Sequence, residues 1–219
     1  MYFSEDQSLA LNSRIRALEK STGVELLAAV VDKCDHYPEI PWKAFASGAA
    51  AGALLMLIQV VMRPNWISAA TALTPMLAIL GAGTLTALLT VVWPGWARCF
   101  LDKIRAEGEM RQYAQALFLT HEVFRVPDRC GILLVVGLFE RQVVILPDLG
   151  IASRVPADAL ANVIDAMLPL LKQGNRREAL FEGLAKLEAQ LQKAGFTPRG
   201  DGPDRIPEAL LQQKGGADA

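Results

Sequence analysis

The chain has 219 residues, of which 52% are hydrophobic and 21% charged, and its formal net charge is -1. A balance this close to neutral leaves no polybasic surface, so no nucleic-acid partner is expected. Cys34, Cys99 and Cys130 lie far apart and form no CxxC pair, so the sequence suggests neither a disulfide framework nor a cysteine zinc site.

The first 31 residues have the pattern of a soluble domain. Met1 to Ala10 contains two acids, no lysine or arginine and no apolar stretch, so it lacks the features of a secretory signal. Ser4 and Gln7 form a capping-box pattern, and Gly23 is a plausible helix stop. Between them lies a helical apolar face of Leu9, Leu11, Ile15 and Leu18. The apolar run Val24 to Val31 predicts a strand buried on both faces.

Two long stretches without charge come next, and they predict a transmembrane hairpin. The first runs from Ala44 to Met62 and the second from Pro64 to Ala97, with Arg63 between them. Each stretch can supply the roughly 20 residues that cross a bilayer core as a helix. Neither has the polar face of a soluble helix. Within a hairpin unit of residues 42–97 we expect spans at about 44–62 and 75–92 and a connection at 64–74.

The flanks of the hairpin predict how it would lie in a membrane. All four tryptophans fall at the ends of the expected spans, where indoles are enriched: Trp42, Trp66, Trp93 and Trp96. Small residues would let the two helix backbones approach closely: Ser47, Gly48, Gly52, Gly81 and Gly83. Basic residues flank the hairpin on both sides, and only Arg63 lies in the connection: Lys33, Lys43, Arg98, Lys103, Arg105 and Arg111. The positive-inside bias then places both termini in the cytoplasm of a bacterial inner membrane.

Two apolar segments after the hairpin predict a pair of strands. A long helix over residues 99–123 comes first, with packing positions at Ile104, Ala114, Leu117 and Phe118. Gly131–Phe139 and Val143–Leu146 are rich in β-branched residues, and Glu140, Arg141 and Gln142 separate them. A third span would place Glu140 and Arg141 near the bilayer centre at a cost of a few kcal/mol each. We therefore expect a soluble β-hairpin with an exposed polar turn.

Two further helices are expected to cover the sheet. Pro156 opens the first, whose apolar face holds Leu160, Val163, Ile164 and Met167. Asn175 starts the second, whose apolar face holds Ala179, Leu180, Leu184, Leu187 and Leu191. Residues 195–219 lose this periodicity and gain glycine, proline and charge, which predicts a flexible tail with one apolar patch at Ile206–Leu211.

Several short motifs in these segments resemble the TPM domain family. They are Thr22-Gly23-Val24-Glu25, AQALF at Ala114–Phe118, Gly131-Ile132-Leu133-Leu134, Glu140-Arg141-Gln142-Val143, Asp148-Leu149-Gly150-Ile151, and the Leu170–Leu184 region with Gly174. The resemblance covers about residues 8–192 and is to a bacterial membrane subgroup that carries two spans after the first strand. It implies an α/β fold in which residues 1–41 and 98–194 form a small mixed sheet sandwiched by helices and interrupted by the transmembrane hairpin.

The resemblance also implies two kinds of activity. Relatives outside the cytoplasm are described as acid phosphatases or calcium binders, and others as accessory factors for membrane complexes. This chain differs from them in two motifs. Asp128-Arg129-Cys130-Gly131 stands where the relatives have Asp-Asn-Gly, displaced by one position, and Pro147-Asp148-Leu149-Gly150 stands where they have Gly-Tyr-Gly.

Three aspartates at strand ends are candidate ligands of a divalent cation. Asp32 ends the first strand, Asp128 precedes the second and Asp148 follows the third. If the first and third strands run parallel, Asp32 and Asp148 lie at carboxyl ends, where open α/β sheets bind ligands. Asp128 belongs at the other end if the second strand is antiparallel to the third. Such oxygen ligands suit Mg²⁺ or Ca²⁺, although each aspartate can equally be a solvated loop carboxylate.

The remaining candidate residues do not define a reaction. Arg141 resembles the family's turn arginine and could contact an anion or a partner, but a solvated turn explains it more simply. His36 and His121 are too few for a histidine zinc site. We expect a membrane-anchored module that assists another membrane protein without catalysis and that can form a homo-oligomer. The alternative is a metal-dependent phosphatase of low activity that hydrolyses phosphomonoesters.

Overall fold

The computed structural model describes residues 3–62, 69–198, 210–213 and 215. They separate into two compact units. Met1–Asp35 and Ala106–Ala219 form the first, and His36–Arg105 forms the second. The first is an α/β unit made from two segments of chain, and the second is helical. The structural division therefore assigns the short segments next to the long apolar helices to the helical unit.

The first helix of the α/β unit, α1 (Glu5–Thr22), begins and ends at the predicted caps. The Ser4 hydroxyl accepts the Gln7 backbone N–H at 3.3 Å, and the Gln7 side chain accepts the Ser4 N–H at 3.2 Å. Gly23 ends the helix in the left-handed conformation that glycine adopts without strain. Leu11, Ile15 and Leu18 are buried as predicted. Leu9 is 67% exposed because it lies two residues, about 200° of helix rotation, away from that stripe.

The sheet contains four described strands in the order β3-β2-β1-β4. They are β1 (Glu25–Val31), β2 (Gly131–Gly137), β3 (Gln142–Pro147) and β4 (Leu210–Gln213). Strand β1 pairs in parallel with both β2 and β4, whereas β2 and β3 form the predicted antiparallel hairpin. The two central strands are nearly continuous apolar runs, as a sheet covered on both faces requires.

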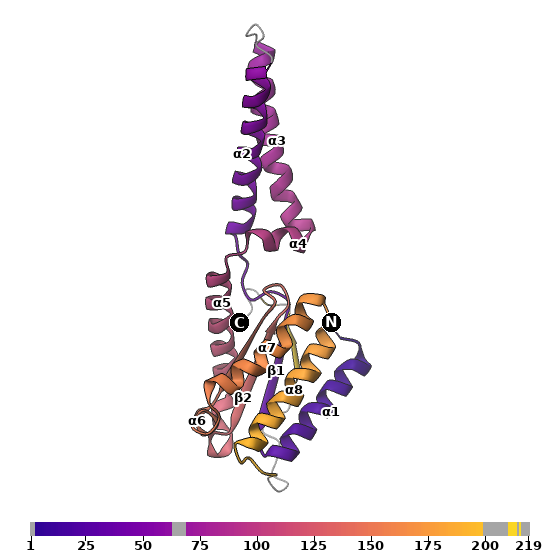
Figure 1. The fold of residues 1–219 in the computed structure, drawn as a ribbon, viewed down its shortest axis with the longest axis vertical. Coiled ribbons are helices and arrows are strands. Elements are labelled where there is room, and N and C mark those ends of the chain that lie inside the picture. The colour runs from indigo at the N-terminus through magenta and orange to yellow at the C-terminus, as the bar shows by residue number, and fades with distance from the viewer. Residues whose placement is uncertain (1–2, 63–68, 199–209, 214, 216–219) are drawn as a thin grey trace. The chain divides into compact units, whose positions relative to one another are not determined.

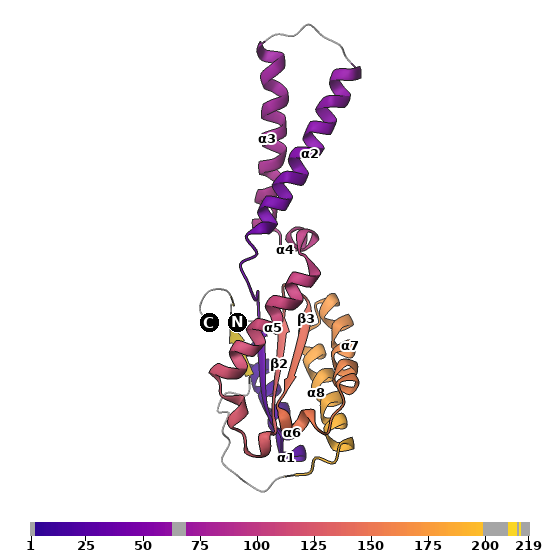
Figure 2. The ribbon, with the colours of Figure 1, turned by 90° about the vertical axis from the view of Figure 1, so that its left-hand side faces the viewer.

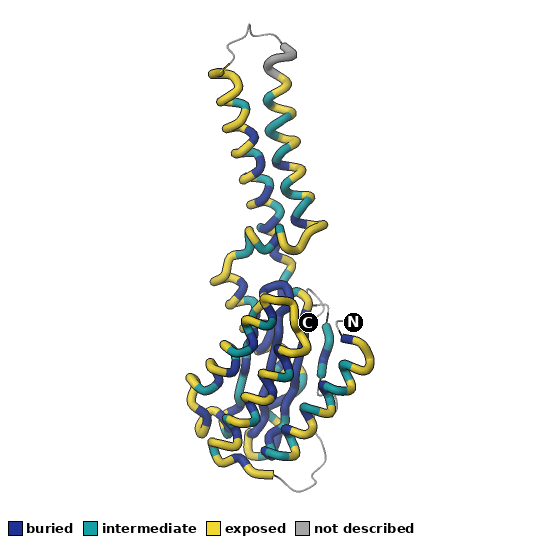
Figure 3. The backbone as a smooth tube through the Cα atoms, turned by 45° about the vertical axis from the view of Figure 1, so that its right-hand side comes forward, coloured by how far each residue is buried: buried dark blue, intermediate teal, exposed yellow. Residues whose placement is uncertain are grey.

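Helices cover both faces of this sheet (Figures 1 and 2). On one face lies α5 (Lys103–Thr120), which belongs to this unit from Ala106 onward. On the other lie α1, α7 (Ala157–Gln173) and α8 (Arg176–Lys193), with α8 packed between its two neighbours. The central strands β1 and β2 between these layers are buried, whereas the edge strands β3 and β4 are partly buried (Figure 3). The predicted mixed sheet sandwiched by helices is therefore confirmed.

Short helical turns connect these elements at the end of the sheet where β2 begins. They are η2 (Val123–Arg125), η3 (Pro127–Arg129) and α6 (Leu149–Ala152). The expected helix over residues 99–123 is thus divided: η1 (Arg98–Phe100) comes first, α5 ends at Thr120, and η2 follows. Ile104 is exposed rather than packed, whereas Ala114 and Leu117 are buried.

Strand β4 corrects the expectation of a flexible tail at residues 210–213, and most of the other residues expected in that tail lie outside the described part of the chain. Leu210–Gln213 pair with Ala28–Val31, and the Leu211 side chain joins the hydrophobic core. The Gln212 side chain donates to the Ser8 hydroxyl at 3.0 Å, and its oxygen accepts the Phe3 N–H at 3.4 Å. The four-residue Leu-Leu-Gln-Gln segment is too short to show the periodicity of a strand. It is held as a strand by its pairing with the edge of β1, which the sequence does not reveal.

The helical unit consists of two long antiparallel helices and a short turn. They are α2 (Glu39–Met62), α3 (Ala69–Val92) and α4 (Pro94–Ala97), and η1 follows. Both long helices are long and apolar enough to cross a membrane. Helix α3 begins before the expected start at residue 75, since Pro75 lies inside it. A proline removes one backbone hydrogen bond but does not have to end a helix.

Small residues allow the close packing of α2 on α3, as predicted. A Cβ added at Gly48 would overlap the Thr86 side chain, and one at Gly83 would lie 2.8 Å from the Phe45 ring. Gly52 faces Ala82 in the same way. The Thr86 hydroxyl donates across the interface to the Ala44 carbonyl oxygen at 2.9 Å. Two other predicted positions do not take part. Gly81 has open space beside it, and the Ser47 hydroxyl donates within its own helix.

The tryptophans of the described residues lie near the ends of these helices. Trp42 is in the first turn of α2, and Trp93 immediately follows α3, and both are exposed. The Trp96 indole N–H donates to the Thr86 carbonyl oxygen at 3.2 Å. Trp66 lies outside the described residues.

Candidate functional site

The direction of the strands places the three candidate aspartates at two different ends of the sheet. Asp32 follows β1, whose last residue, Val31, pairs with Gly137 at the end of β2. The Asp148 N–H donates to the carbonyl oxygen of Gly131, the first residue of β2, at 2.9 Å. Strands β1 and β3 are therefore antiparallel, so the condition for bringing Asp32 close to Asp148 is not met.

Asp128 and Asp148 lie at the same end of the sheet, where β2 begins. Strand β2 has seven residues, and a strand of that length extends about 20 Å. Asp32 is thus separated from the other two by roughly the length of the sheet. Because metal ligands lie about 2–2.6 Å from their ion, the three aspartates cannot share one cation in this arrangement.

The loop before β2 has an unusual backbone. Asp128 and Arg129 are both in the left-handed region, with φ values of 59° and 57°. This conformation costs on the order of 1 kcal/mol for a residue other than glycine. The loop is packed against α6 so closely that a Cβ at Gly150 would overlap the Asp128 carbonyl oxygen and lie 2.8 Å from that of Arg129. A glycine is required at position 150 for this approach.

Asp148 is the buried charged group of this end of the sheet. Its side chain is 3% exposed, and one of its oxygens accepts the Leu149 N–H at 2.8 Å, which caps the first turn of α6. The Arg129 Nε lies 3.1 Å from Asp148 Oδ1 and 3.0 Å from Oδ2. The Arg129 side chain is 48% exposed. A buried carboxylate therefore has its opposite charge supplied by the preceding loop.

These residues do not fit the divalent cation that the family resemblance implies. The Asp148 carboxylate is already paired with a guanidinium, and Asp128 is exposed. Among the residues that the structure describes, no group of three or more His, Cys, Asp or Glu side chains is placed to hold a metal ion. Sequence reasoning did not single out Arg129. The sequence signal that could have indicated its role is the basic residue directly after Asp128, in a motif where the relatives have asparagine.

The other end of the sheet, where Asp32 lies, is closed by the β2–β3 turn. The Leu138 N–H donates to the Val31 carbonyl oxygen at 2.9 Å, and the Phe139 N–H donates to that of Asp32 at 2.8 Å. Glu140 was expected in an exposed polar turn, but it is only 7% exposed. Its carboxylate accepts the Cys34 backbone N–H at 2.9 Å, so the turn is folded over the segment that leaves β1.

Arg141 completes this turn with a φ of 52° and is exposed, which places it on the surface as the solvated-turn interpretation expects. The Lys33 ammonium lies 5.2 Å from the centre of the Phe139 ring. This distance allows a cation–π interaction. The aromatic ring and the buried carboxylate together fix the backbone where the chain leaves the α/β unit after β1.

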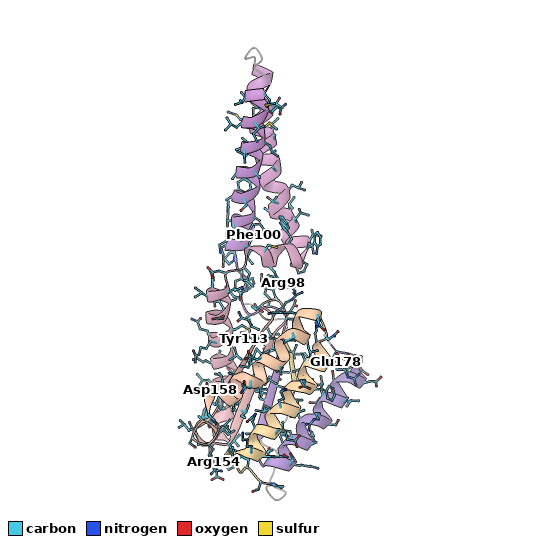
Figure 4. The ribbon with its side chains drawn as sticks, viewed as in Figure 1. Arg98, Phe100, Tyr113, Arg154, Asp158 and Glu178 are labelled. Carbon is cyan, nitrogen blue, oxygen red and sulfur yellow. The ribbon has the colours of Figure 1, made fainter. Side chains whose placement is uncertain are left out.

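The nucleophilic side chains near Asp32 are not activated. Burial, with a contribution from the Glu140 charge, raises the pKa of the Cys34 thiol, so this thiol is protonated at neutral pH. The Tyr113 hydroxyl on α5 (Figure 4) donates to the Gln213 side chain of β4. Burial, with a contribution from Cys34, raises the pKa of Tyr113 to about 12. Neither group has the lowered pKa that nucleophilic catalysis uses.

The arrangement of these elements defines a small α/β sandwich, and part of it matches a known domain family. Residues 99–190 match the family model of the TPM domain. The matched segment is similar to the TPM domain and begins after α2 and α3, which are inserted after the first strand of the sheet. No curated protein matches the chain in sequence.

Two solved structures share this fold. One is the NMR structure of the BA42 protein from the psychrophilic bacterium Bizionia argentinensis, with a TM-score of 0.57, 16% identity and coverage of 97% of this chain and 96% of that chain. The other is the N-terminal domain of a protein from P. gingivalis, with a TM-score of 0.51, 16% identity and coverage of 91% and 83%. At this level of identity the likeness concerns the fold alone.

Proposed function

We propose that this chain is a membrane-anchored TPM module of the bacterial inner membrane, whose α/β unit binds or assists another membrane protein on the cytoplasmic side. The observation that carries the proposal is the exposure of α2 and α3. In the apolar window of each helix only 11% of the residues are buried. Large side chains on both helices are exposed: Leu54, Leu57, Val61, Leu77, Leu80 and Val92.

A lipid environment explains this exposure. A helix in the core of a soluble protein buries its apolar residues, whereas these two helices bury little beyond their mutual contact (Figure 3). An apolar surface of this extent in water would drive association or insertion. The backbone groups of a helix are satisfied internally, so such a pair can lie in lipid without unpaired polar groups. The excess of basic residues on the flanks supports the cytoplasmic side for the α/β unit.

The membrane anchor predicts a specific response to charged substitutions. The full chain should remain in the membrane pellet after carbonate extraction. The triple variant Leu57→Arg, Leu77→Arg and Leu80→Arg should be largely released, because each arginine in a bilayer costs about 3 kcal/mol. Leu9→Arg with Leu119→Arg is the matched control, since both leucines are exposed on the α/β unit. Release of the unmodified chain, or retention of the triple variant, would contradict the anchor.

The orientation has its own readout in the same preparation. Cys99 is exposed and follows α4, close in sequence to the second segment of the α/β unit. Its labelling therefore reports on which side of the membrane that unit lies. In intact spheroplasts a membrane-impermeant maleimide should leave Cys99 unmodified. The same reagent should modify a cysteine introduced at Asn65, between the two helices, in a Cys99→Ser background. The reverse labelling pattern would place the α/β unit outside the cytoplasm.

A binding role without catalysis is favoured by the state of the candidate groups. Asp148 is ion-paired, the Cys34 thiol is protonated, and Asp32 lies at the opposite end of the sheet from the other two candidate aspartates. Family resemblance alone supports the alternative, a metal-dependent phosphatase. Mild crosslinking in cells, followed by purification, tests the proposed role directly. Recovery of the chain with no crosslinked membrane protein would contradict it.

The two functions differ in a simple assay. The detergent-solubilised chain should release no phosphate from a generic phosphomonoester with Mg²⁺, Mn²⁺ or Ca²⁺ beyond the rate without protein. The variants Asp32→Asn, Asp128→Asn and Asp148→Asn should give the same result. Metal-dependent hydrolysis that is lost in Asp128→Asn or Asp148→Asn, and kept in Asp32→Asn, would establish the phosphatase alternative at the β2 end of the sheet.

A further inference from the structure

In the ion pair between Arg129 and Asp148, the loop before β2 itself supplies the positive charge that lies beside the buried carboxylate. Asp148 is buried at the end of β3, and Arg129 reaches it from η3, so the pair joins the two strands of the hairpin at their open end. A carboxylate removed from water is costly unless a positive group compensates its charge. We infer that the Arg129 guanidinium takes the place of a divalent cation in this TPM domain and that the loop folds without metal.

The geometry supports a built contact rather than an incidental surface pair. The Arg129 Nε lies within 3.1 Å of both carboxylate oxygens, and the partner carboxylate is almost fully buried. The left-handed backbone at Asp128 and Arg129 sets the direction of the loop. Gly150 lets the carbonyl oxygens of the same loop approach α6. The cost of two left-handed residues is offset by a contact that only this backbone path provides.

A divalent cation and the guanidinium would compete for the same carboxylate. Ca²⁺ needs six to eight oxygen ligands and Mg²⁺ about six, and both repel a neighbouring positive charge. The Asp148 carboxylate also accepts the Leu149 N–H as the cap of α6, which uses a further lone pair. A metal would therefore have to displace Arg129 first. The inference concerns only the α/β unit and does not depend on the membrane anchor.

Native cysteines provide a local probe of this loop. Cys130 follows Arg129 directly and is buried, and Cys34 is buried at the opposite end of the sheet. In a Cys99→Ser background of the full chain in detergent, maleimide reacts with Cys130 only when the loop opens. Dividing the labelling rate of Cys130 in the folded chain by its rate in denaturant gives the fraction of time for which the thiol is accessible. Cys34 then reports whether the whole unit is still folded.

The first measurement is a double-mutant cycle. Arg129→Gln and Asp148→Asn should each raise the Cys130 labelling rate about tenfold, with a smaller change at Cys34. The double variant should be no faster than the faster single variant, because both changes remove the same interaction. Arg125→Gln is the matched control, since Arg125 pairs with Glu122 on the surface one turn earlier. Independent, multiplying effects of Arg129→Gln and Asp148→Asn would overturn the inference.

The second measurement is a titration with the metal ions alone. Ca²⁺ or Mg²⁺ at millimolar concentration should leave the Cys130 labelling rate of the Arg129-containing chain unchanged. A cation that slows this labelling, with the slowing abolished by Asp148→Asn, would show a bound metal at Asp148 and overturn the inference. Arg129→Lys separates charge from geometry: it should label faster than the parent, because lysine cannot align a planar guanidinium with the carboxylate. Equal Cys130 labelling rates in the Arg129→Lys variant and the parent chain would contradict the role assigned to the guanidinium.

Discussion

Deleting residues 210–219 should destabilise the α/β unit by about 5 kcal/mol, a large part of the stability of a typical domain. Strand β4 covers the outer edge of β1, whose residues 28–31 would lose their backbone partners. The Asp32 N–H, which donates to the Gln213 carbonyl oxygen at 3.2 Å, would lose its acceptor. Burial of Leu211 would be lost as well, at about 2 kcal/mol of that total.

The test uses Cys130, which lies at the end of β2 away from the place where the C-terminal segment leaves β1. Its maleimide labelling in the truncated chain should approach the rate in denaturant. Truncation after Gly215 keeps β4 and is the control. A single substitution tests the same contact without removing the segment. Leu211→Asp should strongly destabilise the α/β unit, whereas Leu9→Asp, at an exposed position of α1, should not. A truncated chain with Cys130 as protected as in the full chain would show that β4 contributes little.

Glu140→Ala should cost about 2 kcal/mol, because it leaves the buried Cys34 N–H without the carboxylate oxygen that accepts it. Glu140→Gln keeps an acceptor oxygen in a side chain of nearly the same shape, and it should cost less than half as much. An exposed turn residue would instead tolerate both substitutions within about 0.5 kcal/mol. The comparison therefore separates the buried turn seen in the structure from the exposed turn expected from the sequence.

The quantity to be measured is the midpoint of thermal unfolding of the full chain, with Cys130 labelling as the probe of unfolding. This probe is needed because the tryptophans at 42, 66, 93 and 96 all lie outside the α/β unit. Arg141→Ala is the neighbouring control, since Arg141 is exposed in the same turn. Equal stability of Glu140→Ala and Glu140→Gln would mean that the hydrogen bond to Cys34 does not hold the turn in place.

Much of the fold follows from local signals. The capping residues Ser4 and Gln7 and the stop at Gly23 act through the backbone of their own helix, so sequence neighbours are enough to predict them. The apolar runs of β1 and β2 indicate strands buried on both faces, and the two glycines Gly48 and Gly52 indicate close helix packing. Each of these predictions depends on residues a few positions apart.

The candidate site could be predicted only in part. That Asp128 and Asp148 flank strands is visible in the sequence, but the distance of Asp32 from them depends on the direction of β3 relative to β1. The pairing of Arg129 with Asp148 crosses 19 positions of chain and requires two left-handed residues. Neither property has a periodic or compositional signature.

The sequence by itself therefore determined the class of each long element and the insertion of two apolar helices after the first strand, because hydrophobic periodicity and caps act locally. Tertiary structure alone decided that Leu210–Gln213 joins β1, that Glu140 turns inward, and that a guanidinium accompanies Asp148. These outcomes depend on which backbone groups and charges meet after folding. A buried donor, a strand edge or a carboxylate takes its partner from whatever part of the chain the fold brings to it.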